Sequence, residues 1–392
     1  MSHLLLPDPA TPARTFSALA EAGALEPAEP VLVKVPDGCW VEMGALAFLG
    51  AWGAALTERG GRVLLRGDDG YLGRMDLHAA LGADPPAMHR RDEAGRFLPV
   101  RLVRRLEDIV PVVSAVTEIF SAQVSEAGDL LPAMQWIVAE ILENVFLHAD
   151  TPHPAAVCAQ HYPNAGRIDL AICDVGRGLR SSLAATHPVY SDGHAIDLAV
   201  ERGVSGSDEP GRGNGLAGTL EIARHNRAAA TVWSGTALYT FRGGDDKGFE
   251  EIPRVPGTGV ALQLSTRQPV RLAETWIAEV TGLQLLEERE TPGAAVIRVA
   301  EECPVLGARD GATEAARRIE ALAGEGRTVR VDFTGVGIAS TSFLNELLGR
   351  PAARLGPERF RERVEVAGMS ELVRRLADVA IARRLRDSGV AG

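Results

Sequence analysis

Three polar residues at a spacing of four, Glu140, Asn144 and His148, are the first candidates for chemistry in this 392-residue sequence. They lie in a stretch that is predicted to be one helix, because apolar residues recur there at steps of four and three: Leu130, Met134, Ile137, Ile141 and Val145. At 3.6 residues per turn, the three polar side chains follow one another about 40° apart beside that apolar stripe. The pattern indicates either a polar edge exposed to solvent or one wall of a cleft.

Three further signals follow along the chain. A predicted strand at 167–173 runs directly into Asp174-Val175-Gly176-Arg177-Gly178, and a glycine cluster at 211–215 precedes a predicted helix at 217–225. Glycines ahead of a helix N-terminus let backbone N–H groups approach an anion closely. Finally, Gly257-Thr258-Gly259 opens an apolar strand at 260–264. Each signal alone is short, but together and in this order they indicate a nucleotide site.

Together, these four signals resemble the pattern of the GHKL (Bergerat-fold) ATPases. That pattern is ExxxN on a helix, then DxGxG after a strand, GxGxG before a helix and GT before a strand. That family includes gyrase-type topoisomerases, heat-shock chaperones, the mismatch-repair protein MutL, sensor histidine kinases and anti-sigma-factor serine kinases. The resemblance covers roughly residues 111 to 266. It implies a central α/β sandwich with a mixed sheet covered by helices, and it implies ATP and Mg²⁺ as ligands.

The resemblance also implies roles for individual residues. Glu140 matches the carboxylate that activates the attacking water, Asn144 the amide that coordinates Mg²⁺, and Asp174 the carboxylate that accepts from the adenine amino group. The other implied ATP contacts are the turn that leaves room for the base at Gly176 and Gly178, the phosphate-binding segment at Gly211, Gly213, Asn214 and Gly215, and the supporting hydroxyl of Thr258.

The residue types fit these roles without the family. A purine needs a directional acceptor in an apolar slot, which an aspartate at the end of a buried strand can provide. Mg²⁺ keeps several waters, so one amide oxygen together with phosphate oxygens is a sufficient site. Glu140 lies one turn from Asn144, where it could take a proton from water. Glu143 is the rival carboxylate and is expected at the surface or in a helix pair; a direct role for His148 stays open.

Two strand-helix-strand units flank this region and form a candidate repeat. The first has apolar strands at 31–35 and 61–65 around an apolar run at 43–56; the second has a strand at 328–333, a turn and a helix at 341–350. Such units predict parallel strand pairs. At fourteen residues, the run at 43–56 is too short to span a bilayer core of roughly 30 Å, so a buried helix is expected.

Both units resemble STAS domains, the fold of anti-sigma-factor antagonists. Residues 331–344 follow the STAS signature without a gap, and they also resemble STAS-like domains of unknown function found beside GHKL ATPases. Ser342 falls on the phosphorylatable serine, although Ser340 and Phe343 replace the usual aspartate and glycine. In the first unit the matching positions are Met43 and Gly44, which carry no hydroxyl. The alternative for the hydroxyls at 340–342 is an N-cap cluster for the following helix.

Composition places limits on the function. Acidic residues exceed basic ones by 52 − 41 = 11, which argues against a chain built to coat nucleic acid. The four cysteines have no CxxC spacing and are expected to be free thiols of a cytoplasmic protein, and nothing indicates a membrane protein. We expect domains at 1–108 (STAS-like), 109–266 (GHKL) and 267–392 (STAS-like). We also expect a mobile lid at 179–210, a polar insertion at 243–257 and an amphipathic helix around Trp276.

The sequence thus predicts a Mg-ATP-binding regulatory switch, in which nucleotide binding changes how the STAS-like domains contact each other or a protein partner. Two alternatives stay open. One is a protein kinase acting on a STAS hydroxyl such as Ser342, and the other is a nucleotide-sensing scaffold without chemistry. Self-association through the STAS-like domains is a further possibility within the switch.

Overall fold

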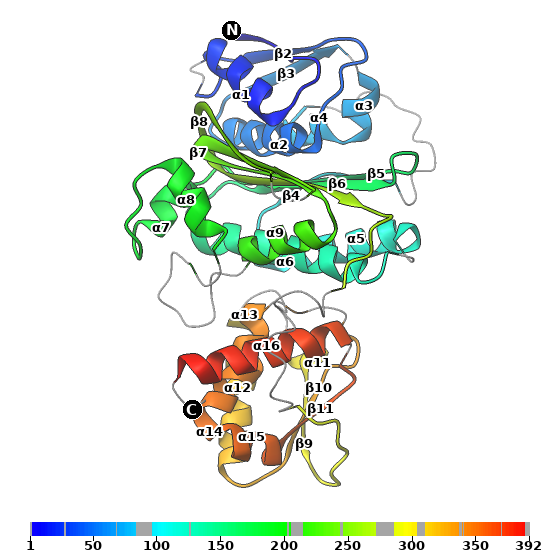
Figure 1. Ribbon diagram of the computed structural model, residues 1–392, viewed down its shortest axis with the longest axis vertical. Coiled ribbons are helices and arrows are strands. Elements are labelled where there is room, and N and C mark those ends of the chain that lie inside the picture. The colour runs from blue at the N-terminus through cyan, green and yellow to red at the C-terminus, as the bar shows by residue number, and fades with distance from the viewer. Residues whose placement is uncertain are drawn as a thin grey trace.

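The protein has a mixed α/β fold with three sheets, seen from the side in Figure 1. The computed structural model describes residues 2–26, 29–67, 69–83, 96–124, 127–201, 204, 215–243, 246–271, 286–303, 310–336, 339, 341–369 and 371–388. An N-terminal unit, a central sheet with its helices and a C-terminal unit follow one another along the longest axis of the molecule.

The central sheet has five strands in the order β4 (Phe97–Val103), β5 (Ala155–Tyr162), β6 (Arg167–Cys173), β8 (Asp246–Ser265) and β7 (Ala229–Arg242). All four pairings are antiparallel, whereas the resemblance implied a mixed sheet. The physical reason is connectivity, because short turns join β5 to β6 and β7 to β8. Strand β8 begins at Asp246 and pairs with β7 along its length, so the polar insertion expected at 243–257 is largely strand.

One face of this sheet carries the helices α5 (Ile109–Phe120), α6 (Leu130–His148) and α9 (Gly215–His225), with short 3-10 turns at Leu106–Asp108 and Ser121–Gln123. Helix α6 buries more than the expected stripe, since Trp136, Val138 and Leu142 are also buried. Among the described residues it is the one helix long and apolar enough to cross a membrane, but 67% of that window is buried inside the fold. Such burial is typical of a core helix.

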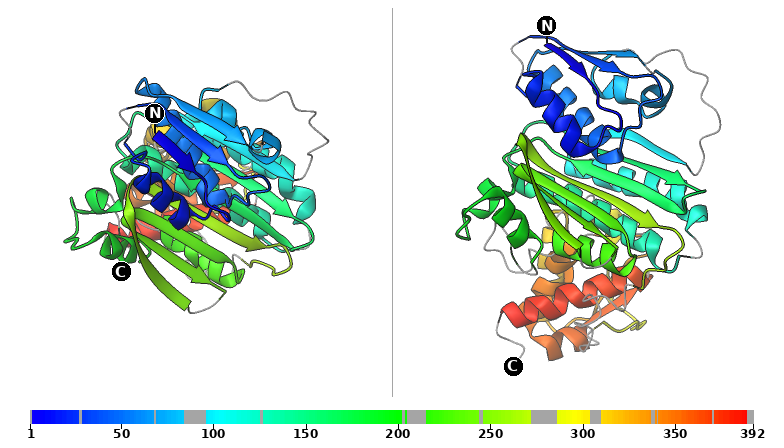
Figure 2. Two further views of the ribbon diagram at one scale, coloured as in Figure 1. Left: turned by 90° about the horizontal axis from the view of Figure 1, so that it is seen from above. Right: turned by 45° about the horizontal axis from the view of Figure 1, so that its top comes forward.

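The N-terminal unit covers the opposite face of the central sheet (Figure 2). Its own sheet is parallel, with β2 (Val31–Val35) between β1 (Ser2–Leu5) and β3 (Val63–Gly67), which confirms the predicted parallel pair. The helices are α1 (Pro12–Glu21), α2 (Met43–Glu58), α3 (Asp69–Arg74) and α4 (Leu77–Ala80). Strand β4 lies before the expected boundary at residue 108 but pairs with β5 in the central sheet.

Helix α2 is packed between the two sheets, and every residue from Met43 to Leu56 is buried. Its apolar residues point in all directions, as a helix with apolar neighbours on both sides requires. Glycines allow the close approach: a Cβ on Gly44 would lie 2.8 Å from Pro12 Cγ and 3.1 Å from Ala261 Cβ, and one on Gly50 would lie 2.7 Å from Val100 Cγ1. The N-terminal unit and the central sheet therefore share one apolar core.

The C-terminal unit repeats this strand order, with β10 (Val329–Asp332) between β9 (Ala295–Arg298) and β11 (Val364–Ala367), all parallel. The helix expected at 341–350 begins as α13 (Thr341–Leu344), continues as a π-helical turn η4 (Asn345–Gly349) and ends as α14 (Arg350–Leu355). The remaining helices are α11 (Val299–Glu302), α12 (Asp310–Gly324), α15 (Pro357–Arg363) and α16 (Glu371–Asp387). The helix expected around Trp276 lies outside the described residues.

Candidate functional site

A pocket opens between helix α6, the end of β6 and the segment that follows it. Its volume is about 110 Å³, below the roughly 300–1,000 Å³ of pockets for drug-sized ligands. The walls are largely apolar, with the side chains of Ile141, Val145, Ile172, Leu179, Leu183, Leu216 and Val260. Polar groups enter from Asn144, His148, Asp174, Ser182 and Thr258. An apolar pocket with a few polar groups suits the apolar body of a small ring and its polar edge.

Asp174 is the buried acid of this pocket, with a side chain that is 5% exposed. It follows β6, whose pairing with β5 and β8 fixes where the chain emerges from the sheet. The Gly176 N–H donates to its Oδ1 at 2.7 Å. Burial raises the pKa of Asp174 to about 6, against the lowering effect of backbone hydrogen bonds from Gly176 and Thr258. Asp174 is therefore an ionisable acceptor near neutral pH.

Thr258 lies beside Asp174 on the adjacent strand. The Asp174 N–H donates to the Thr258 carbonyl at 2.9 Å, and the Thr258 hydroxyl is 3.3 Å from the hydroxyl of Ser234. Ser234 in turn donates to the Gly257 carbonyl at 3.0 Å and accepts from the Leu179 N–H at 2.9 Å. This network ties the start of α7 (Gly178–Leu183) to the sheet beneath the pocket.

The glycines after Asp174 are required by close packing. Gly178 has a φ of +76°, and a Cβ there would lie 2.9 Å from Ser234 Oγ. At Gly176 a Cβ would collide with the backbone of Ala149, at the end of α6. Gly178 lines both this pocket and a second cavity on the other side of the loop, and Gly176 lines the second cavity alone. The two glycines thus let the loop pass between two cavities.

Asn144 lines the pocket where α6 meets the first residue of α9, Gly215. A Cβ on Gly215 would lie 2.8 Å from Asn144 Nδ2 and 3.2 Å from Glu140 Oε2, so Glu140 and Asn144 both face the start of α9. Glu140 is 9% exposed and lies behind Asn144, outside the residues that line the pocket. Glu143 was expected at the surface or in a helix pair; at 3% exposure it is buried, so the surface alternative is wrong. Its place on α6 packs it inside the fold.

The segment expected to be a lid contains two short helices, α7 and α8 (Asp192–Ala199). Asp192 is 5% exposed, and its Oδ2 accepts from the Thr236 N–H at 2.9 Å and from the Thr236 hydroxyl at 3.0 Å. Arg254 Nη2 also donates to this oxygen, at 3.3 Å. Asp192 thereby fixes the start of α8 to the β7–β8 hairpin.

The structure brings together Asn144, Asp174, Gly178, Gly215 and Thr258 around one pocket, with His148 beside them. Gly211, Gly213 and Asn214 lie outside the described residues. Ser342 belongs to α13 in the C-terminal unit, and its side chain is also outside the described part of the chain. Sequence reasoning missed Ser234 and Asp192, because each acts through partners far away in sequence and neither belongs to a motif.

Metal binding here would depend on few protein ligands. In the described part of the chain, no group of three or more His, Cys, Asp and Glu side chains could hold a metal ion. The pocket offers one protein ligand that suits Mg²⁺, the amide oxygen of Asn144. Phosphate oxygens and water would have to supply the other ligands of the ion. The four cysteines are buried free thiols, as predicted.

Comparison with known proteins identifies one region of this chain. Residues 316–374 match the model of a STAS-like domain of unknown function (DUF4325). The match spans β10, the helices α13 to α15 and β11, so it coincides with the body of the C-terminal unit. No curated protein and no solved structure matches the chain. The STAS-like match indicates a regulatory or interaction role.

Proposed function

We propose that this protein binds Mg-ATP in the pocket between α6 and β6 and uses the nucleotide to regulate an interaction made by its STAS-like unit. The observation that carries the proposal is Asp174, a buried carboxylate among apolar walls at the end of an internal strand. An adenine ring offers the matching donor, its amino group, on a flat apolar body.

The other residues support the same ligand. With the base against Asp174, the phosphates would extend along the polar flank of α6 toward Asn144 and the first turn of α9, where helix N–H groups and the helix dipole favour negative charge. Bound Mg²⁺ would neutralise phosphate charge, and the Asn144 amide oxygen would hold it there. Glu140 lies one turn before Asn144, next to Gly215, so its carboxylate could take a proton from a water near the phosphates.

The regulatory part of the proposal rests on the STAS-like match and on the short helices α7 and α8 beside the pocket. A nucleotide changes an interaction only if it binds one arrangement of the protein more tightly than another. Leu179, Leu183 and Ala199 of this segment line the pocket, so a bound base would contact them directly. A phosphotransfer function toward Ser342 is the alternative, with the same nucleotide site and a different acceptor.

Calorimetric titration of the full chain with ATP and Mg²⁺ tests the binding site. We expect saturable binding by the wild type, and a loss on the order of 1–3 kcal/mol in Asp174→Asn because the acceptor becomes a mismatched amide. Asp169→Asn is the control, since this buried carboxylate on β6 bonds Arg167 and lies outside the pocket. Absence of ATP-dependent heat in the wild type would refute the proposal.

A second experiment assigns the general base. Glu140→Gln should keep ATP affinity while phosphate release falls by about 10²–10⁴-fold, the usual contribution of a general base. Glu143→Gln, a second buried carboxylate on the same helix, is the matched control. If only Glu143→Gln stops turnover, Glu143 and not Glu140 is the base; if Glu140→Gln loses affinity equally, Glu140 belongs to the binding of phosphate and metal.

A further inference from the structure

A second cavity, of about 540 Å³, lies on the other side of the 174–178 loop from the nucleotide pocket. The end of α1 and the residues after it form one wall, with Ala20, Gly23, Leu25 and Glu26. The loop, α7 and the β7–β8 hairpin form the other wall. This volume falls within the range of roughly 300–1,000 Å³ that is typical of small-molecule sites. The cavity therefore has the size of a ligand site and is built from two units of the chain.

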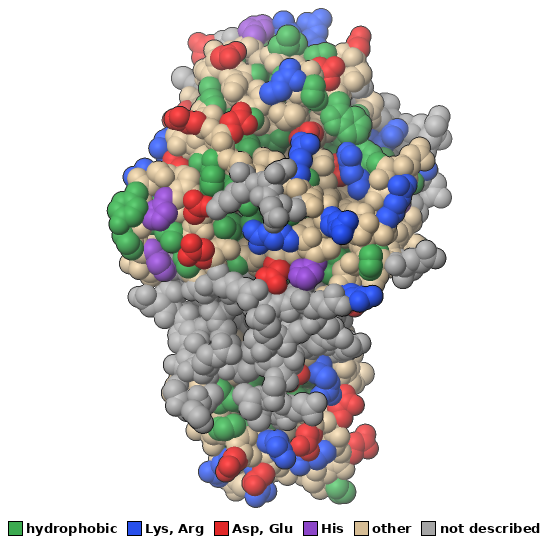
Figure 3. All heavy atoms as spheres, in the orientation of Figure 1, with side chains coloured by type: hydrophobic (Ala, Val, Ile, Leu, Met, Phe, Trp, Pro, Cys, Tyr) green, Lys and Arg blue, Asp and Glu red, His purple; other side chains and the backbone are tan. Residues whose placement is uncertain are grey.

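Three arginines line this cavity, Arg177, Arg180 and Arg254. Over the face shown in Figure 3, in contrast, basic and acidic side chains are interspersed. Two carboxylates also line the cavity, Asp192 and Glu26, but Asp192 is already occupied by Thr236 and Arg254. The cavity thus presents more guanidinium than carboxylate charge, in a chain whose overall net charge is −11.

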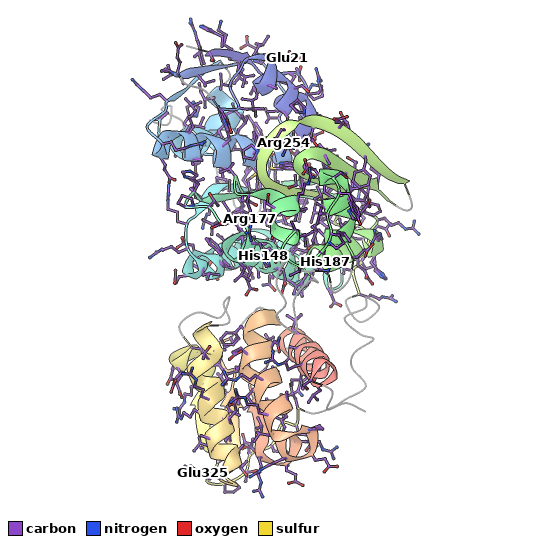
Figure 4. The ribbon with its side chains drawn as sticks, turned by 90° about the vertical axis from the view of Figure 1, so that its left-hand side faces the viewer. Glu21, His148, Arg177, His187, Arg254 and Glu325 are labelled. Atoms are coloured by element: carbon purple, nitrogen blue, oxygen red, sulfur yellow. The ribbon has the colours of Figure 1, made fainter. Side chains whose placement is uncertain are left out.

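Each of the three arginines also bonds an element next to the nucleotide pocket. Arg177 Nε donates to the His148 carbonyl at 2.7 Å, and both residues are labelled in Figure 4. Arg180 Nη2 donates to the Tyr190 carbonyl at 3.3 Å, in the connection between α7 and α8. Arg254 holds Asp192 at the start of α8. The cavity and the nucleotide pocket are therefore linked through three guanidinium groups.

A guanidinium carries five N–H donors in a planar fork that matches carboxylate and phosphate oxygens. Each described bond of these arginines uses a small part of that capacity, and all three side chains are exposed to solvent. An anion could consequently bind without breaking the internal bonds. It would then fix the guanidiniums in place and hold α7 and α8 more firmly against the sheet.

We propose that this cavity is a regulatory site for a small organic or inorganic anion, bearing carboxylate or phosphate groups, whose binding stabilises the α7–α8 segment. The anion site stands on the cavity and its arginines and does not require that the neighbouring pocket bind ATP. If both sites are occupied, each ligand should tighten the binding of the other by the same factor, since coupling between sites is reciprocal. Couplings of this kind typically amount to about 5–150-fold in affinity.

Thermal unfolding of the full chain without nucleotide tests the site, with inorganic phosphate and succinate as probes at constant ionic strength in chloride. We expect saturable stabilisation by at least one probe, and the comparison of the two distinguishes phosphate from carboxylate ligands. Arg180→Gln should weaken it at least several-fold, whereas Arg62→Gln, an exposed arginine on the N-terminal unit, should leave it unchanged. Stabilisation that equals that of chloride, or that survives Arg180→Gln, would overturn the proposal.

Two further readouts separate an anion site from a general effect of charge. Glu26→Gln removes a carboxylate from the cavity and should strengthen probe binding, in the opposite direction to Arg180→Gln. Hydrogen exchange of residues 179–200 should slow when the probe binds, while exchange of α16 stays constant. Unchanged exchange in α7 and α8 would refute the regulatory part, and equal weakening by Glu26→Gln and Arg180→Gln would refute the anion site.

Discussion

The N-terminal and C-terminal units have the same three-stranded parallel sheet in the same sequential order, yet they differ at the helix that follows the middle strand. In the N-terminal unit this helix is α2, which is buried between two sheets. In the C-terminal unit it is the run of α13, η4 and α14, which packs mainly on α12 and α16 of the same unit. One topology therefore places this helix between two sheets in one case and among the helices of its own unit in the other.

The two units also differ at the positions that match the STAS phosphorylation site, which are Met43 and Gly44 in the first unit and Ser342 in the second. Gly44 lies at the start of α2 against Pro12, Ala261 and Trp233, so the interface leaves no room there for even a methyl group. In the C-terminal unit, Thr341 and Ser342 begin α13 after the middle strand, and Phe343 is fully buried. Phe343, which replaces the usual glycine, thus contributes to the unit's own core. The N-terminal copy is specialised for packing, and this restricts any regulatory hydroxyl to the C-terminal copy.

The largest expected loss of stability comes from replacing Glu365, which is fully buried on β11 and paired with Arg330 at 2.8 Å. Burial acts to raise its pKa, but hydrogen bonds from Thr291 and Arg330 prevail, so its pKa lies below the ordinary 4.5. Glu365→Ala leaves Arg330 and Thr291 without this partner and should cost about 3–5 kcal/mol. We expect the loss in urea unfolding followed by circular dichroism.

The matched control is Glu325→Ala, an exposed carboxylate of the same unit (Figure 4). Four of the five tryptophans lie in the N-terminal unit, α6 and β7, and Trp276 lies outside the described residues, so most of the tryptophan fluorescence should change little in Glu365→Ala. Because the pKa of Glu365 is lowered, its contribution is present above about pH 4.5 and is lost as the pH falls through the folded-state pKa. Equal shifts in fluorescence and circular dichroism would show that the C-terminal unit does not unfold separately from the rest of the protein.

Gly44→Ser should have the next largest effect. It adds atoms 2.8 Å from Pro12 Cγ, and overpacking of this kind typically costs about 1–3 kcal/mol. Because α2 joins the N-terminal unit to the central sheet, the loss should appear in tryptophan fluorescence, to which Trp52 and Trp233 contribute. Gly324→Ser is the control, since a Cβ there meets nothing within 4 Å. An unchanged midpoint in Gly44→Ser would contradict the tight interface.

Asp174→Asn should raise the free energy of unfolding of the protein without nucleotide by about 1–2 kcal/mol at pH 8. The raised pKa of Asp174 sets the upper limit of this gain, since each pKa unit corresponds to roughly 1.4 kcal/mol. The folded-state pKa of about 6 exceeds the ordinary 3.8, so the contribution of Asp174 is most favourable below pH 3.8 and falls as the pH rises to about 6. The gain should be absent at pH 4.

Measurement of the two proteins by urea unfolding at pH 4 and pH 8 checks this prediction. The gain should appear in tryptophan fluorescence, because Asp174 directly follows β6 of the sheet that the N-terminal unit covers. Because the folded-state pKa is about 6, ATP affinity should weaken as the pH falls through that value, since the protonated carboxyl is neutral and accepts more weakly from the amino group. A gain of equal size at both pH values would mean that ionisation of Asp174 is not its cause.

The smallest expected effect concerns phosphate transfer to the C-terminal hydroxyls. Incubation of the full chain with Mg-ATP should leave its intact mass unchanged, because serine and threonine are common at the start of a helix without any role in phosphate transfer. Ser342→Ala and Thr341→Ala are the paired variants. A gain of one phosphate that disappears in Ser342→Ala alone would support the kinase alternative and extend the contrast between the two units.

Local patterns predicted much of this fold. The helix at 130–148, the strand before Asp174 and both strand-helix-strand units follow from apolar periodicity and from glycine positions, which act over a few residues. The start of α9 at Gly215 also agrees with the glycine cluster that precedes it. Features that a single segment specifies were therefore accessible to sequence reasoning.

The features that were missed depend on contacts between distant segments. The burial of Glu143 depends on what packs around α6, and the polar 246–257 segment becomes strand because β7 offers it a partner. The network of Ser234 and the anchoring of Asp192 likewise join residues more than 20 positions apart. A single sequence contains no direct record of such pairings.

The burial of α2 also has a consequence for biosynthesis. The face of α2 that points toward the central sheet is covered by β5, β6 and β8. Strand β8 ends about 200 residues after the helix does. At a synthesis rate of roughly 5–20 residues per second, α2 would wait about 10–40 s for its last covering strand. Until β8 is made, the growing chain carries one of its most apolar segments incompletely covered. The yield of the protein in the cell should therefore depend on chaperones that bind nascent chains.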